Sequence, residues 1–220
     1  MNTEKNKLFG LILAGGRSQR MGQDKALMSY HGKPQVEYVR DLLKEFCAEI
    51  FISGRSKQGL SFPNASVGNP EHTVSGPPIK TFGGDNFIED MPQFVDAGPL
   101  TGILSAMTAY PGVSWLVMAC DLPFADEKTL RYLIKHRDPV KAATAFISTH
   151  DGLPEPLCAI WEAGGYEHFI SIFKQGARCP RKTLTGSDAH LIIQQNPRWL
   201  DNVNTPEEYR QALRNLNITI

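Results

Sequence analysis

The stretch that decides the fold runs from Leu11 to Ala26 and reads Leu-Ile-Leu-Ala-Gly-Gly-Arg-Ser-Gln-Arg-Met-Gly-Gln-Asp-Lys-Ala. The apolar run over residues 8–13 predicts a buried strand, which ends at the adjacent glycines Gly15 and Gly16. Backbone without side chains lets main-chain N–H groups approach an anion closely. Three cations follow within a dozen residues: Arg17, Arg20 and Lys25. We therefore predict a nucleoside triphosphate loop at the carboxyl end of the first strand of an α/β sheet.

Two better-known phosphate-binding loops do not fit this stretch. A Walker A loop has Gly-x4-Gly followed by Lys and then Ser or Thr, whereas Gly15 is followed by Gly16 and Arg17. The dinucleotide-binding pattern Gly-x-Gly-x-x-Gly is also absent, because Gly22 comes too late. The simplest alternative is a glycine-rich surface turn with solvated basic residues. The gathering of three cations in one loop argues against it.

The composition indicates one α/β domain without a global charge. A chain of 220 residues with 41% hydrophobic residues can bury a sizeable core. The formal net charge is zero, so we expect neither nucleic acid nor a membrane as a partner. There is no apolar run of about 18 residues, and residues 1–7 are polar. The four cysteines form no Cys-x-x-Cys pair, and we expect reduced thiols in a cytoplasmic protein.

Apolar runs alternate with amphipathic stretches along the chain, as in a parallel sheet with crossover helices. We expect strands over residues 8–13, 50–52, 115–119, 142–147 and 157–161. We expect helices from Pro34 to about Cys47, from Pro99, after the N-cap Asp126, over residues 166–174, and from Pro206 behind the capping pair Thr205 and Glu208. From about residue 57 to 91 the pattern dissolves into Pro, Gly, Ser and Asn. We interpret this segment as a loop insertion, with a short strand near residues 79–82, in a single domain over residues 1–220.

Asp121 directly follows the apolar stretch over residues 115–120, which places its carboxylate at the ligand crevice of an open parallel sheet. A carboxylate beside a triphosphate would repel it unless a divalent cation lay between them. Mg²⁺ prefers one or two carboxylates together with phosphate oxygens and water. The alternative is that Asp121 only holds the turn before Pro123. Lys25 and Arg20 are candidates to stabilise charge on a transferring phosphoryl group, and Asp24 either fixes one of these bases or is solvated.

From Leu13 to Lys25 the chain carries Leu-Ala-Gly-Gly-x-Ser-x-Arg-Met-Gly-x-Asp-Lys intact. This pattern resembles the MobA-like nucleotidyltransferases, the family of the molybdenum cofactor guanylyltransferases. Four later stretches agree with the family and occur in its order: residues 98–103, 120–123, 154–157 and 202–208. The resemblance implies a three-layer Rossmann-like fold with a mostly parallel central sheet. It also implies a Mg²⁺-dependent enzyme that transfers GMP from GTP to molybdopterin and releases pyrophosphate.

The resemblance also implies roles for particular residues. Catalysis is expected from Arg20, Lys25 and Asp121, and Asp121 is the expected magnesium ligand. The nucleotide is expected to contact Leu13, Ala14, Gly15, Gly16, Lys25, Asp90, Gly98 and Asp121. In related cytidylyltransferases the loop usually reads Ala-Ala-Gly, so by family analogy the Ala-Gly-Gly of this chain favours guanine.

Two departures from the family pattern leave assignments open. After the second strand the family often has an Asn that contacts the nucleotide, whereas this chain offers Ser53 or Arg55. For the Asp that precedes Gly-Pro-Leu we prefer Asp90 and hold Asp96 in reserve. Asn202 and Asn204 project to one side of an extended chain. They either contact the substrate phosphate or its metal, or only end a strand.

Two other functions compete with this interpretation. One is a related nucleotidyltransferase that uses CTP or a sugar-phosphate acceptor. The other is a nucleotide-binding module without turnover, against which the presence of both Lys25 and Asp121 argues. The expected partners are GTP and molybdopterin, with transient contact to other proteins of cofactor synthesis.

Overall fold

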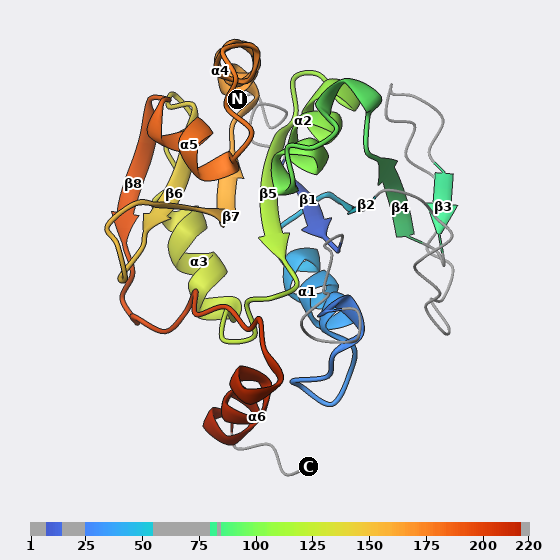
Figure 1. The fold of residues 1–220 in the computed structure, drawn as a ribbon, viewed down its shortest axis with the longest axis vertical. Helices are drawn as coiled ribbons and strands as arrows, with labels where there is room; N and C mark the ends of the chain where they lie inside the picture. The colour runs from blue at the N-terminus through green and yellow to red at the C-terminus, as the bar shows by residue number, and fades with distance from the viewer. Residues whose placement is uncertain (1–7, 15–24, 55–79, 83–84, 217–220) are drawn as a thin grey trace.

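A computed structural model of the chain describes residues 8–14, 25–54, 80–82 and 85–216. These residues include one eight-stranded sheet with the order β3-β4-β2-β1-β5-β7-β6-β8 (Figure 1). The strands are β1 (Leu8–Leu13), β2 (Glu49–Gly54), β3 (Lys80–Phe82), β4 (Asp85–Glu89), β5 (Ser114–Ala119), β6 (Ala143–Ile147), β7 (Pro154–Trp161) and β8 (Ala189–Ile193).

Six of these strands run in the same direction, and β3 and β7 run opposite to their neighbours. The central strand β1 pairs in parallel with β2 on one side and with β5 on the other. Both β1 and β5 are buried along their whole length, as expected for parallel strands covered on both faces. The mostly parallel α/β sheet predicted from the sequence is therefore confirmed.

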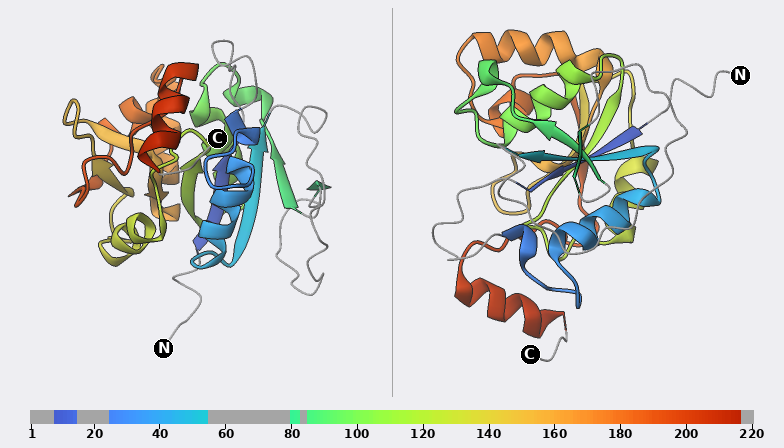
Figure 2. Two further views of the ribbon diagram at one scale, coloured as in Figure 1. Left: turned by 90° about the horizontal axis from the view of Figure 1, so that it is seen from below. Right: turned by 90° about the vertical axis from the view of Figure 1, so that its right-hand side faces the viewer.

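Helices cover both faces of the sheet and form a three-layer domain (Figure 2). On one face, α1 (Gln35–Lys44) and α3 (Glu127–Lys135) pack against the even-numbered apolar residues of β1 and β5, such as Ile12 and Met118. On the other face, α2 (Pro99–Ala109), α4 (Tyr166–Lys174) and α5 (Pro180–Thr185) pack against the odd-numbered ones, such as Leu11 and Val117. This alternation follows from the two-residue repeat of a strand. None of the helices in the described ranges is long and apolar enough to cross a membrane.

Helix α6 (Pro206–Asn215) stands apart from these two helical layers (Figures 1 and 2). Its residues Ala212 and Leu213 pack on Met28 and Tyr30, which follow the short helix η2 (Lys25–Leu27). The helix begins as the sequence predicts, because the Thr205 side chain accepts a hydrogen bond from the Glu208 N–H. The carboxylate of Glu208 in turn accepts from the N–H of Thr205. The C-terminal helix thus covers the segment that contains Lys25.

The segment from residue 57 to 91 departs in part from the expected loop insertion. The expected short strand is present as β3, but residues 85–89 form a further strand, β4, which pairs in parallel with β2. Phe87 and Ile88 of β4 are buried, so this end of the segment belongs to the core of the sheet. Residues 55–79 and 83–84 lie outside the described ranges. The sequence analysis did not predict β8 and α5.

Candidate active site

Asp121 lies where the parallel strands β1 and β5 end side by side. Ala119 closes β5 opposite Leu13 of β1, and Asp121 follows two residues later. Its backbone carbonyl accepts a hydrogen bond from the Val203 N–H at 2.9 Å, which ties the segment before α6 to this edge of the sheet. The carboxyl edge is where open α/β sheets bind their ligands.

Lys25 joins three segments that are far apart in the sequence. Its Nζ lies 3.2 Å from Oδ2 of Asp121 and 2.5 Å from Oδ1 of Asn204. The side chains of Lys25 and Asp121 are 21% and 22% exposed, so a ligand can reach the pair. The structure thus brings together Lys25 and Asp121, as the sequence predicted.

The second carboxylate oxygen of Asp121, Oδ1, is buried and has no hydrogen-bond partner among the described residues. A buried carboxylate oxygen without a partner is costly, which makes Oδ1 of Asp121 a candidate to bind a ligand. The described residues contain no group of three or more His, Cys, Asp or Glu side chains able to hold a metal. Mg²⁺ is commonly held by one or two carboxylates while substrate phosphates and water complete its shell. The orphaned oxygen of Asp121 fits that kind of site.

Asp90 lies at the same edge of the sheet, directly after β4. The Ser53 hydroxyl at the end of β2 donates to Oδ1 of Asp90 at 3.2 Å. Three strand-to-strand steps separate β4 from β5, so Asp90 and Asp121 are roughly 14 Å apart across the edge. That span suits an elongated ligand such as a nucleotide. Asp96, the reserve candidate, is exposed on a loop and has a φ of 69°, which favours Asp90.

Two glycines of the stretch over residues 98–103 shape this edge. Gly98 precedes α2 with a φ of 56°, a backbone conformation that glycine adopts without strain. A Cβ on Gly102 would lie only 2.3 Å from Oγ of Ser53. The glycine therefore allows α2 to approach the end of β2, next to Asp90.

The remaining candidate site residues named from the sequence fall into two groups. Leu13 and Ala14 are buried at the end of β1, beside Asp121, where only their backbone is suited to meet a ligand. The other group lies outside the described residues, so its contacts stay predictions: Gly15, Gly16, Arg17, Arg20, Asp24 and Arg55.

The turn after Asp121 is held by an aromatic pair that the sequence did not single out. His31 stacks on Tyr38 with ring centroids 3.7 Å apart, and its Nε2 lies 3.0 Å from the Pro123 carbonyl, to which it donates. The Tyr38 hydroxyl donates to the Ala125 carbonyl at 3.4 Å. Burial lowers the pKa of His31 and raises the pKa of Tyr38 to about 12. Both side chains are therefore uncharged at neutral pH, and their hydrogen bonds hold the backbone that follows Asp121.

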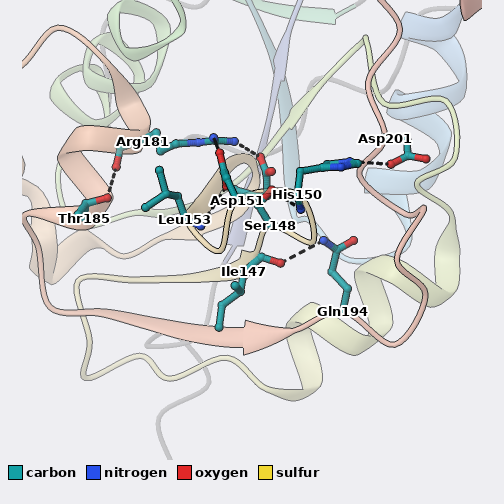
Figure 3. A network of polar contacts seen from close by, with 10 residues as sticks. Ile147, Ser148, His150, Asp151, Leu153, Arg181, Thr185, Gln194 and Asp201 are labelled. Carbon is teal, nitrogen blue, oxygen red and sulfur yellow. Dashed lines mark hydrogen bonds and ion pairs between the residues drawn. The ribbon is translucent and has the colours of Figure 1, made fainter.

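A cavity of about 550 Å³ extends from Asp121 toward the hairpin between β6 and β7. The hairpin carries Ser148, His150 and Asp151, and Arg181 of α5 reaches toward it (Figure 3). His150 also contacts Asp201 at 3.2 Å. The volume is typical of a site for a small organic molecule, so this edge of the sheet offers room for a second substrate beside Asp121.

A comparison with known families decides the relationship. The sequence model described as the MobA-like NTP transferase domain matches residues 10–185. The chain belongs to this family. The match spans the glycine loop, Asp90, Gly98 and Asp121, and ends at Thr185, the last residue of α5. The family predicted from the sequence is therefore confirmed.

Individual relatives of this MobA-like chain carry names from the synthesis of molybdenum cofactors. A "Probable molybdenum cofactor guanylyltransferase" of Bacillus cereus is 28% identical over 222 residues, which cover 96% of this chain and 98% of the relative. A "Molybdenum cofactor biosynthesis bifunctional protein" of Synechocystis is 34% identical over 214 residues, or 96% of this chain. The chain spans only 55% of the length of that relative.

Among solved structures, the MobA-like fold recurs in molybdopterin-guanine dinucleotide biosynthesis protein A from Archaeoglobus fulgidus. The TM-score is 0.69 at 20% identity, and the match covers 95% of this chain and 98% of the other. At this identity the likeness shows the fold alone. It supports the single three-layer α/β architecture described above.

Proposed function

We propose that this protein transfers GMP from GTP to the terminal phosphate of molybdopterin and releases pyrophosphate. The support is membership of the MobA-like family together with the names of its relatives. The single observation that carries the chemistry is the cluster of Lys25, Asp121 and Asn204 at the carboxyl edge of the sheet, with a buried carboxylate oxygen left for a ligand.

The chain's own residues supply positioning and charge. An oxygen of the acceptor phosphate forms a bond to the α-phosphorus of GTP while the bond from that phosphorus to the bridging oxygen of pyrophosphate breaks. Such displacements depend on positioning and on electrostatic stabilisation of the phosphoryl oxygens. The ammonium group of Lys25 lies beside Asp121 and is suited to this task. Arg20 and the backbone of Gly15 and Gly16 are expected to hold the departing pyrophosphate.

The residues present fit a magnesium ion. Asp121 would hold it through Oδ1, and substrate phosphates and water would complete its shell. When bound, the ion neutralises charge on the triphosphate oxygens. Lys25 occupies only Oδ2 of Asp121, which leaves the other oxygen for the metal.

The remaining parts of the proposal concern the base, the location and the partners. Guanine is proposed over cytosine on the Ala-Gly-Gly loop, by family analogy. A cytoplasmic location and transient contact with other proteins of cofactor synthesis complete the proposal.

The experiment measures pyrophosphate release from GTP, CTP, ATP and UTP, each with and without molybdopterin and with and without Mg²⁺. We expect release to need molybdopterin and Mg²⁺ and to be fastest with GTP. A site that hydrogen-bonds the polar edge of a base can reject an analogue by large factors. Equal or faster release from CTP would overturn guanine transfer and leave nucleotidyl transfer standing. No release from any nucleotide would overturn the enzymatic proposal.

A further inference from the structure

The cavity beside Asp121 is lined by residues of two chemical kinds. Its polar lining residues include Asp121 and Asn202, and Asp121 contacts Lys25. Its apolar lining residues are flat or branched: Pro99, Leu122, Pro156, Leu157, Pro180 and Leu200. Three prolines and three leucines around one space suit the faces of a planar ring better than a flexible chain.

Polar groups in this cavity come as a fixed donor next to a fixed acceptor. Arg181 donates through Nη1 to Oδ2 of Asp151 at 2.6 Å and through Nη2 to Oε2 of Glu155 at 2.9 Å. Asp151 also accepts from the Leu153 N–H in its own turn, so it anchors the guanidinium. Glu155 is the most sheltered of the three side chains at 19% exposure, against 32% for Arg181 and 43% for Asp151.

This pair matches the polar edge of one heterocycle. A 2-amino-4-oxopyrimidine ring, as in a pterin, presents two adjacent N–H donors and, beside them, a carbonyl acceptor. A carboxylate accepts from the two donors, and a neighbouring guanidinium donates to the carbonyl. Hydrogen bonds to charged groups are stronger than those between neutral groups.

We propose that the cavity between α5 and the β6–β7 hairpin binds the pterin ring of the acceptor and that Glu155, with Arg181 beside it, recognises its amino–oxo edge. The inference rests on the proposed function, since it names how the same enzyme recognises its acceptor. Guanine has an equivalent edge, but Ser53 and Asp90, which are expected to contact the nucleotide, lie at the carboxyl ends of strands β2 and β4, on the opposite side of β1 from β5 and β7.

The test compares pterin with lumazine, which carries an oxo group where pterin has its 2-amino group. Binding of each fluorescent compound is titrated to wild type, Glu155→Gln and the control Asp188→Asn, together with GTP affinity in the presence of Mg²⁺. Asp188 forms an ion pair with Lys141 at 2.9 Å on the exposed surface, so its variant also removes one carboxylate charge. Circular dichroism shows whether each variant folds, and Arg181→Met is used if Glu155→Gln does not.

We expect wild type and Asp188→Asn to bind pterin roughly tenfold to a hundredfold more tightly than lumazine, the range of one strong hydrogen bond to a charged group. Glu155→Gln should lose this preference and keep its affinity for GTP. An unchanged preference in Glu155→Gln, or none in wild type, would overturn the inference. Weakened GTP affinity, or competition between GTP and pterin, would instead identify the cavity as the guanine site. Molybdopterin-dependent pyrophosphate release, measured in the same preparations, tests the proposed function separately.

Discussion

An ion pair lies near each end of strand β5, and the two pairs differ in how fully their carboxylates are hydrogen-bonded. At its amino end, the Arg137 guanidinium donates to both oxygens of Glu162, through Nε at 2.7 Å and Nη2 at 2.8 Å. The Ser114 hydroxyl also donates to Glu162 at 2.7 Å and accepts from the Ala163 N–H at 3.1 Å. At its carboxyl end, Lys25 meets a single oxygen of Asp121 and leaves the other without a partner in the described chain.

The difference separates a pair that supports the fold from one that we propose to serve a ligand. Arg137 and Glu162 are 10% and 2% exposed, and the hydrogen-bond demand of the carboxylate is met from within the protein. The side chains of Lys25 and Asp121 are about twice as exposed as that of Arg137. One carboxylate oxygen of Asp121 has no hydrogen-bond partner among the described residues. Each of the following predictions tests whether the two ends can be told apart by experiment.

The largest effect is expected at the amino end. Glu162→Gln turns an amide donor toward Arg137 and leaves a sheltered guanidinium without its counter-charge. Breaking such a buried pair typically costs about 3–5 kcal/mol in the free energy of unfolding, which urea denaturation measures. Glu127→Gln is the control, because its exposed i,i+4 pair with Arg131 is worth only about 0.2–0.5 kcal/mol. Equal stability of the two variants would contradict a structural role for Glu162.

At the carboxyl end, Lys25→Ala should spare the fold and remove activity. Losing one group that stabilises transition-state charge costs on the order of 10² to 10³ in rate. Pyrophosphate release gives the rate, and the denaturation midpoint should stay close to that of wild type. A folded variant with near-normal turnover would remove Lys25 from the active site.

Asp121→Asn tests the unbalanced carboxylate itself. The substitution keeps the shape of the side chain but removes the negative charge that would attract Mg²⁺. We expect turnover to fall at ordinary Mg²⁺ and to recover in part at high Mg²⁺. Stability should change little, because Oδ1 of Asp121 has no hydrogen-bond partner among the described residues that the substitution could remove. An unchanged Mg²⁺ requirement would move the ligand to Asp90, and an unfolded variant would favour the structural role at the turn before Pro123.

These contrasts also explain which parts were predictable from the sequence. Strands β1 and β5 are continuous apolar runs because both of their faces are buried. Strand β4 reads Asp-Asn-Phe-Ile-Glu, and its strand conformation depends on pairing with β2, where Ile52 faces Phe87. The local pattern of apolar residues contains no information about such a pairing, so the sequence predicts a loop for this stretch.

The candidate site divides in the same way. Lys25 and Asp121 were predictable as neighbours because loops after parallel strands meet at one edge of a sheet. The contact of Lys25 with Asn204 spans 179 residues and depends on how α6 returns to η2. Arg181 was missed because it belongs to a six-residue helix, and His31 because its function depends on stacking against Tyr38.

A smaller effect is expected at the start of α6, which supports Asn204 at the carboxyl end. Thr205→Ala removes the acceptor for the Glu208 N–H, while the Glu208 carboxylate still accepts from the Asn204 N–H at 2.6 Å. Loss of an N-cap side chain costs about 1 kcal/mol, or a melting temperature lower by roughly 2–4 °C in a domain of this size. Thr205→Ser keeps the cap and should restore the wild-type value. Equal melting of the Ala and Ser variants would show that the cap contributes nothing.

The smallest effect is a pH dependence at His31, which clamps the backbone after Asp121. Burial lowers the pKa of His31 in the folded protein, whereas in the unfolded chain the imidazole binds a proton from about pH 6.5 downward. The unfolded state therefore binds more protons as the pH falls, so wild type should lose stability relative to His31→Gln between pH 7.5 and pH 5. His168→Gln controls for the loss of a histidine as such, because His168 also faces a backbone carbonyl, that of Gly186 at 3.0 Å, but is exposed. Melting temperatures of the three proteins across this range give the comparison. Parallel curves for wild type and His31→Gln would mean that the ring is solvated in the folded state and that Pro123 is held in another way.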